Sequence, residues 1–220
     1  MTNAYIFLNG EFSENINFYN SLNIKHLFCA DGGAKKAMQL GIIPKEVWGD
    51  FDSLDDSDLQ WLKKNNVTLN KFNADKDFTD GELLIQYVST LNYEKIYILG
   101  GTGGRIDHEL TNLNLCFKYP KIIFKTEKED IFPINFNHIF ESLVQYTVSF
   151  IPFSDQVTNL TLNGFKYPLK NFLLNRGDSI CISNIITDKN AQIEFESGKI
   201  LCILNSRWLF LLNTVGYLIV

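Results

Sequence analysis

The chain has 220 residues, of which 45% are hydrophobic, which is enough for an ordinary core in one or two domains. Its net charge of -5 lacks the basic excess that a nucleic-acid surface needs, so we expect no nucleic-acid partner. The N-terminus has no signal pattern, and the four cysteines are far apart without a C-x-x-C pair. These features predict a cytoplasmic protein with free thiols.

The first half of the chain alternates short apolar runs with helical patterns. Strands are predicted at residues 5–8, 26–30, 47–49, 67–72, 95–100 and 121–124. Helices are predicted at residues 34–40, 55–65, 79–91 and 107–117. Such alternation is typical of an α/β domain with a mostly parallel sheet and flanking helices.

The second half loses the helical period and predicts a small all-β sandwich domain. Its strands are expected at residues 146–153, 160–163, 179–183, 191–195 and 200–204. A charged linker that contains Pro133 is predicted at residues 125–137. We therefore expect an α/β domain over residues 1–130 and a sandwich domain over residues 138–220.

The apolar stretch at residues 208–220 raises the question of a membrane span. It is shorter than the ~20 residues that a spanning helix needs, and polar residues such as Asn213 interrupt it. Two buried strands joined near Asn213 are the better prediction. No membrane partner is expected.

Four polar signatures follow the predicted strands of the first half. They are Ala30-Asp31-Gly32-Gly33-Ala34, Gly49-Asp50-Phe51-Asp52-Ser53, Lys76-Asp77-Phe78-Thr79-Asp80-Gly81-Glu82 and Gly100-Gly101-Thr102-Gly103-Gly104-Arg105-Ile106-Asp107-His108. Open α/β folds bind their ligands at the carboxyl ends of the strands, where these acids, glycines and one arginine would gather. This arrangement indicates magnesium and a polyphosphate.

Asp50 and Asp52 are separated by a single residue. If this segment is extended, both carboxylates project to one side and Phe51 to the other. Two hard oxygen donors suit Mg²⁺, which usually takes one or two carboxylates and leaves its other positions to water and phosphate. A purely structural role in turns or helix caps is preferred instead for Ser53, Asp55, Asp56 and Asp58.

The third signature has a structural explanation for two of its residues. Thr79 and Glu82 match a capping box, in which Thr79 caps the helix and Glu82 returns the bond. The box leaves Asp77 and Asp80 unexplained, although the helix dipole also favours acids in a first turn. Lys76 either neutralises phosphate or is simply solvated.

The glycine cluster at residues 100–104 lies between a predicted strand and a predicted helix, where backbone N–H groups can cradle phosphate. It matches neither a Walker A loop nor G-x-G-x-x-G. Arg105 offers a planar fork for phosphate. Asp107 can bind metal, orient Arg105 or accept a proton, and His108 is interpreted as structural.

Together the four signatures resemble the thiamine pyrophosphokinase family, in which A-D-G-G-A, G-D-x-D-S, D-x-T-D and G-G-R-x-D-H occur in this order. The match is close over residues 26–112, and residues 163–169 and 183–184 resemble landmarks of the family's β domain. The resemblance implies transfer of a pyrophosphoryl group from ATP to the hydroxyethyl oxygen of thiamine, giving thiamine diphosphate and AMP. It also implies a homodimer whose active sites lie between the α/β domain of one subunit and the β domain of the other.

The resemblance assigns roles by position. It implies magnesium binding and catalysis by Asp50, Asp52 and Asp80, with further catalytic roles for Arg105 and Asp107. Residues implied to bind ATP or thiamine are Asp31, Lys76, Thr79, Gly101, Gly104, Ser183 and Asn184. Phe165 and Tyr167 offer aromatic surface in the β half.

Two other functions use the same residues. A magnesium phosphohydrolase would use the acids with water as the acceptor, and a regulatory nucleotide-binding module would bind without turnover. Thiamine-dependent formation of AMP distinguishes the kinase from both. Which aspartate accepts the hydroxyl proton, which nucleotide and metal are preferred, and which thiamine analogues are accepted are left open by the sequence.

Overall fold

The structure is a computed structural model that describes residues 2–72 and 77–205. The chain forms two compact units, divided between Thr126 and Glu127, and each has its own core. The strands expected at residues 208–220 lie outside the described residues. In the described part, no helix combines the length and the apolar character that a membrane crossing requires.

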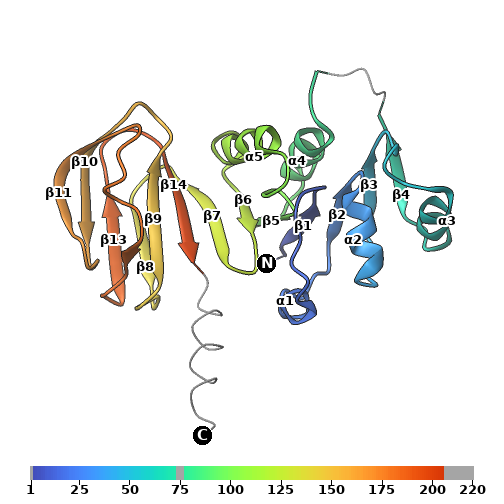
Figure 1. The fold of residues 1–220 in the computed structure, drawn as a ribbon, viewed down its shortest axis with the longest axis horizontal. Coiled ribbons are helices and arrows are strands. Elements are labelled where there is room, and N and C mark those ends of the chain that lie inside the picture. The colour runs from blue at the N-terminus through green and yellow to red at the C-terminus, as the bar shows by residue number, and fades with distance from the viewer. Residues whose placement is uncertain (1, 73–76, 206–220) are drawn as a thin grey trace, which may run out of the picture. The chain divides into compact units, whose positions relative to one another are not determined.

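The first unit contains a sheet of six parallel strands in the order β6-β5-β1-β2-β3-β4 (Figure 1). The strands are β1 (Ala4–Phe7), β2 (Leu27–Ala30), β3 (Glu46–Gly49), β4 (Thr68–Lys71), β5 (Ile96–Leu99) and β6 (Ile122–Lys125). The chain proceeds from β1 outward to β4 and then returns to the other side of β1. The strand order therefore reverses at β1, and such a reversal opens a crevice beyond the carboxyl ends of the strands.

Helices cover both faces of this sheet. They are α1 (Ile16–Ser21), α2 (Gly33–Gln39), α3 (Asp56–Lys64), α4 (Asp80–Thr90) and α5 (Ile106–Lys118). Leu27 and Cys29 of β2 share a buried cluster with Ala34 of α2. Phe28 points to the opposite face, where its ring centroid lies 6.4 Å from that of Tyr87 in α4. The predicted parallel sheet with flanking helices is confirmed.

The second unit is a sandwich of two four-stranded antiparallel sheets, which confirms the predicted all-β fold. The strands are β7 (Glu129–Ile134), β8 (His138–Glu141), β9 (Thr147–Pro152), β10 (Gln156–Asn163), β11 (Leu169–Asn175), β12 (Asn184–Ile185), β13 (Asn190–Glu194) and β14 (Ile200–Asn205). One sheet has the order β12-β9-β14-β7 and the other β11-β10-β13-β8. Phe140 and Phe150, from opposite sheets, have ring centroids 5.9 Å apart in the core.

The predicted linker at residues 125–137 is wrong, because most of it forms strand β7. Ile131 and Ile134 are buried, and the strand pairs with β14 so that Pro133 lies opposite Leu201. The strand begins with the charged residues Glu129 and Asp130, and for this reason the sequence pattern predicts a linker here. Helix α1 and strands β8 and β11 were also not predicted.

The strand predicted at residues 179–183 is wrong as well. This segment is a turn, in which the Ile182 N–H donates to the Ser179 carbonyl at 3.2 Å. Ser183 has a left-handed backbone with φ 55, which lies outside the extended region of a regular strand. Only Asn184 and Ile185 pair as a strand, with β9.

Candidate functional site

A pocket of about 360 Å³ opens at the carboxyl edge of the parallel sheet in the first unit. It lies where the strand order reverses, and its walls come from the segments after β1, β2 and β5 and from the first turns of α4 and α5. The lining residues are Leu8, Asn9, Gly10, Ala30, Asp31, Thr79, Asp80, Gly81, Gly100, Gly101, Gly103, Arg105, His108, Glu109 and Asn112. Five predicted site residues are among them, namely Asp31, Thr79, Asp80, Gly101 and Arg105.

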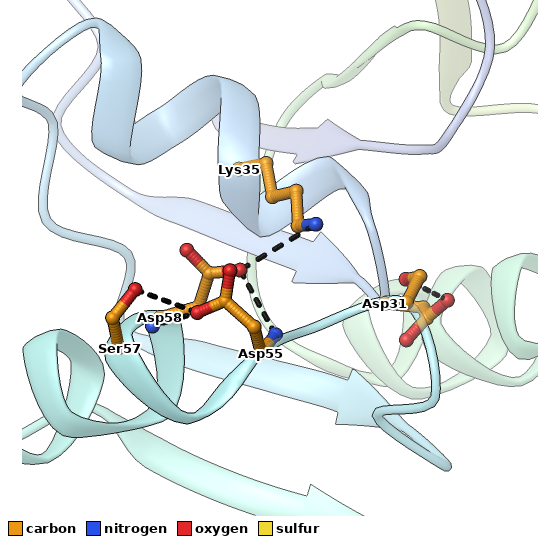
Figure 2. Close-up of polar contacts among 6 residues, drawn as sticks. Asp31, Lys35, Asp55, Ser57 and Asp58 are labelled. Carbon is orange, nitrogen blue, oxygen red and sulfur yellow. Dashed lines mark hydrogen bonds and ion pairs between the residues drawn. The ribbon is translucent and has the colours of Figure 1, made fainter.

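Asp31 lies at the mouth of this pocket, directly after β2. Its backbone is left-handed, with φ 43, and its N–H donates to the Trp48 carbonyl of β3 at 2.8 Å. One carboxylate oxygen, Oδ2, accepts a hydrogen bond from the Ser53 hydroxyl (Figure 2). The other, Oδ1, is buried and has no hydrogen-bond partner among the residues that the structure describes. A buried oxygen of this kind is costly unless a ligand satisfies it.

Asp50 and Asp52 join Asp31 in a cluster whose carboxylate oxygens lie within 4.8 Å of one another, and we call these three residues the acid cluster. The expected extended segment is wrong, because Phe51 is left-handed with φ 67. This turn folds the two acids toward each other, so that the Asp52 N–H donates to Asp50 Oδ1 at 3.2 Å. The Phe51 ring packs on the core of the unit and anchors the turn.

Mutual repulsion dominates the electrostatics of the acid cluster. The pKa of Asp52 is raised above its ordinary value, first by the charge of Asp50 and next by that of Asp31. Asp80, at the start of α4, lies outside the cluster, but its charge contributes to the same shift. Several carboxylates held close together, one with an unpartnered oxygen, form a donor set that fits a hard divalent cation.

Helix α3 begins just after the acid cluster and explains the neighbouring acids. Asp55 and Asp58 form a reciprocal capping box, and the Ser57 hydroxyl donates to Asp55 at 2.6 Å. Lys35 of α2 lies 3.6 Å from Asp58 (Figure 2). The capping interpretation is confirmed for Asp55 and Asp58. Ser53 differs, because its hydroxyl bonds Asp31 within the site.

The start of α4 carries the third signature. Thr79 caps the helix by accepting from the Glu82 N–H at 3.1 Å, as predicted. The Glu82 carboxylate pairs with Lys118 of α5 at 2.6 Å instead of closing the expected capping box. A Cβ at Gly81 would lie 3.3 Å from the Leu8 side chain, a tight contact that a small shift of that side chain would relieve. Lys76 lies outside the described residues.

The glycine cluster forms a compact loop between β5 and α5. A Cβ at Gly101 would lie 2.4 Å from the Phe124 ring, and Gly103 and Gly104 are both left-handed with φ 76. No side chain fits at the first position, and the other two conformations favour glycine. The loop therefore presents backbone to the pocket.

Two residues of α5 that were not predicted fasten this loop. The buried Asn112 amide donates to the Gly101 carbonyl at 2.8 Å, and Glu109 accepts from the Gly103 N–H at 3.0 Å. Asn112 is a polar residue on the buried face of an amphipathic helix. This position in the sequence pattern indicates that its side chain makes a structural hydrogen bond.

Arg105 and Asp107 form a bidentate pair at the start of α5. The Arg105 Nε lies 3.1 Å from Asp107 Oδ1, and Nη2 lies 2.6 Å from Oδ2. The hydrogen bonds from Arg105 lower the pKa of Asp107 to about 2. Among the three roles open for Asp107, this geometry favours orienting Arg105, because both carboxylate oxygens already accept hydrogen bonds from the guanidinium.

For the ATP and thiamine that the sequence resemblance implies as substrates, we expect Asp107→Asn to raise the KM for ATP about two- to fivefold, the range for loss of one exposed pair, and to leave the KM for thiamine unchanged. In the native protein the lowered pKa keeps Asp107 ionised, so the pair is intact above pH 3.8 and is lost only as the pH falls through about 2. The KM for ATP should therefore show no Asp107-dependent change between about pH 5 and 9. Steady-state kinetics test this, with Asp155→Asn, which removes the exposed partner of Arg176, as the control.

Ser183 and Asn184 belong to the second unit, at the start of β12. Asn184 is buried, and its side chain bonds the backbone of Tyr167. Tyr167 itself is 54% exposed.

A glycine loop and an acid cluster at the carboxyl edge of a parallel sheet are typical of α/β proteins that bind phosphate. Two models of known protein families match this chain. Residues 20–127 match the family model described as "Thiamin pyrophosphokinase, catalytic domain", and residues 134–200 match "Thiamin pyrophosphokinase, vitamin B1 binding domain". The chain belongs to the thiamine pyrophosphokinase family, and it is an enzyme with that activity.

Individual relatives are similar in sequence or structure to most of this chain. The thiamine pyrophosphokinase of Bacillus subtilis is 35% identical over 179 residues, covering 79% of this chain and 84% of the relative. Thiamine pyrophosphokinase 2 of Arabidopsis thaliana is 29% identical, covering 77% and 74%. The crystal structure of the Bacillus subtilis enzyme superposes with a TM-score of 0.81 at 28% identity, covering 93% of this chain and 99% of that one. For the Geobacillus thermodenitrificans structure the TM-score is 0.80, also at 28% identity, covering 93% and 98%.

Proposed function

We propose that the pocket of the first unit binds the polyphosphate of ATP and that the acid cluster, together with Asp80, holds Mg²⁺. The observation that carries this proposal is the buried Asp31 Oδ1, which has no partner among the described residues although it lies beside two other carboxylates. When bound, Mg²⁺ supplies positive charge that neutralises the polyphosphate and helps to orient it.

The remaining residues of the pocket complete the phosphate site. Gly101 and Gly104 belong to a loop whose backbone can approach an anion closely, and α5 begins directly after it. Arg105, oriented by Asp107, neutralises charge that develops on the transferred group. Thr79 holds the start of α4, which presents Asp80. Transfer of a pyrophosphoryl group depends mainly on such positioning and charge neutralisation.

We propose that the second unit binds thiamine through Ser183, Asn184 and the exposed Tyr167. The two units contribute different groups. The first unit carries the acids and the phosphate loop, and the second carries an exposed aromatic ring beside polar side chains. A homodimer in which the two kinds of unit meet across the subunit interface would combine these halves. Acceptance of the thiamine hydroxyl proton is assigned to one of the aspartates of the acid cluster or to Asp80.

We further propose a cytoplasmic location. All four cysteines lie in the described part of the chain and are buried free thiols, and such thiols persist in a reducing compartment.

Incubation with ATP and Mg²⁺, with and without thiamine, tests the proposed substrates. We expect AMP and thiamine diphosphate in equal amounts, and only when thiamine is present. Release of phosphate without thiamine would support a phosphohydrolase instead, and the absence of turnover would support a binding module. Omission of Mg²⁺ in the presence of a chelator should abolish the reaction.

A further inference from the structure

Asn184 has little capacity left for a ligand. The side chain is 2% exposed, and its carbonyl oxygen Oδ1 accepts from the Tyr167 N–H at 3.0 Å and from the Ile185 N–H at 2.9 Å. Its amide Nδ2 donates to the Tyr167 carbonyl at 2.8 Å. Three of the four hydrogen bonds that an amide side chain can make are therefore used within the protein.

These bonds hold the segment at residues 165–167 against β12. The Asn184 amide pairs with both the N–H and the carbonyl of Tyr167, as a neighbouring strand would. The Lys166 N–H donates to the Ile185 carbonyl at 2.9 Å, and Phe165 bridges to Ile186. The backbone on both sides of the Tyr167 Cα is thus fixed.

The side chains of this segment differ sharply in exposure. Phe165 is buried among the core aromatics, whereas Tyr167 is 54% exposed. The Lys166 ammonium lies 5.3 Å from the centroid of the Tyr167 ring, so a cation already lies near this ring. An exposed aromatic ring of this kind is suited to a flat cationic ring such as a thiazolium.

Ser183 differs from its neighbour. Its backbone is left-handed, and its N–H donates to the buried Ser149 hydroxyl of β9 at 2.9 Å. Its own hydroxyl has no hydrogen-bond partner among the residues that the structure describes. Ser183 is therefore available to contact a ligand directly. The Asn184 side chain is buried and already uses most of its hydrogen-bonding capacity within the protein.

We propose that Asn184 is a positioning residue: it acts on thiamine affinity through Tyr167, whose ring it orients, and Ser183 acts by direct contact. This proposal rests on the proposed binding of thiamine by the second unit. It separates two adjacent residues that sequence resemblance groups together.

A double-mutant cycle on the full-length protein tests this division. Asn184→Asp keeps the size of the side chain but replaces the donor that faces the Tyr167 carbonyl with a second acceptor. We expect it to weaken thiamine binding about tenfold in the wild-type background and to have no further effect in the Tyr167→Ala background. Ser183→Ala, the matched control, should weaken binding by the same factor in both backgrounds. Calorimetric titration with thiamine gives the four affinities.

Further readouts distinguish positioning from a general loss of structure. The KM for ATP should be unchanged in Asn184→Asp, because the fault is confined to the second unit. If Asn184→Asp does not fold, judged by its melting curve, Asn184→Ser replaces it in the same cycle. Equal losses of affinity in both backgrounds, or no loss in the wild-type background, would overturn the proposal.

A failure of the proposed function itself would give a different experimental result. If the wild-type protein binds ATP but not thiamine, the assignment of a thiamine site to the second unit is wrong before any variant is compared. If the wild type binds thiamine and Tyr167→Ala binds it equally well, the thiamine site stands and the positioning role of Asn184 is overturned.

Discussion

Replacing Asp52 with asparagine is expected to lower kcat by at least about 100-fold, because the proposed magnesium site would lose a charged ligand worth several kcal/mol of transition-state stabilisation. Asparagine has nearly the same size but no negative charge, and Asp52 is exposed, so the fold should persist. The measurement is the rate of thiamine-dependent AMP formation at saturating ATP. Asp56→Asn, which changes an exposed acid in the first turn of α3, is the matched control and should retain normal kcat.

Thermal melting provides a second readout that does not depend on turnover. Repulsion from Asp50 and Asp31 raises the pKa of Asp52, so protonated Asp52 favours the folded state at acid pH and this contribution is lost as the pH rises through the raised pKa. Removal of the charge should therefore leave the Tm of the metal-free protein at neutral pH unchanged or higher. Mg²⁺ should raise the Tm of the wild type but not of the variant. Normal kcat at limiting Mg²⁺ would show that the acid cluster is structural.

Mixing two variants, each defective in a different unit, is expected to restore about a quarter of wild-type activity if each site is shared between subunits. One parent carries Asp52→Asn, and the other carries Ser183→Ala with Tyr167→Ala. After random exchange about half of the dimers are mixed, and each mixed dimer has one intact site composed of the two unaltered halves. Assay at thiamine concentrations below the KM of the second parent makes the gain visible.

A mixture of Asp50→Asn with Asp52→Asn is the matched control. Both changes lie in the first unit, so no mixed dimer contains an intact site, and its activity should stay at the level of the parents. Subunit exchange is verified by native mass measurement. If mixed dimers form and activity still does not return, each subunit builds its site alone.

The fold was predictable where burial follows sequence pattern. The six parallel strands are short apolar runs between helical patterns, and their order along the chain already implies the α/β fold. The hydrophobic pattern gave a wrong prediction where a strand contains charged residues but is partly buried. Strand β7 begins with Glu129 and Asp130 but buries Ile131 and Ile134 against β14, a partner about 70 residues away.

The opposite error occurred at residues 179–183. Ile180 and Ile182 resemble strand residues, yet both are largely exposed in a turn. Their apolar character does not reveal the left-handed Ser183, after which extended pairing with β9 begins only at Asn184. Local sequence carries little information about such a conformation at a residue other than glycine or asparagine.

For the candidate site, the residue types were predictable from the sequence, but their arrangement in space was not. Asp50 and Asp52 were identifiable as a pair because carboxylates at that spacing suit a hard cation. The turn that brings them together was not predictable, because it depends on a left-handed Phe51 whose ring is fixed by the core. The proximity of Asp31 depends on the pairing of β2 with β3, which is a property of the whole sheet.

The central position of β1 has a consequence for the synthesis of the chain. The strand leaves the ribosome before one of its two neighbours, β5, which begins about 90 residues later. At about 5–20 residues per second, one edge of this strand, which is buried in the folded protein, stays unpaired for roughly 5–20 s. Such an edge is a template for association with other nascent chains. We expect the yield of active enzyme in a cell to depend on how well this edge is shielded during translation, a requirement unrelated to the acids proposed to hold Mg²⁺.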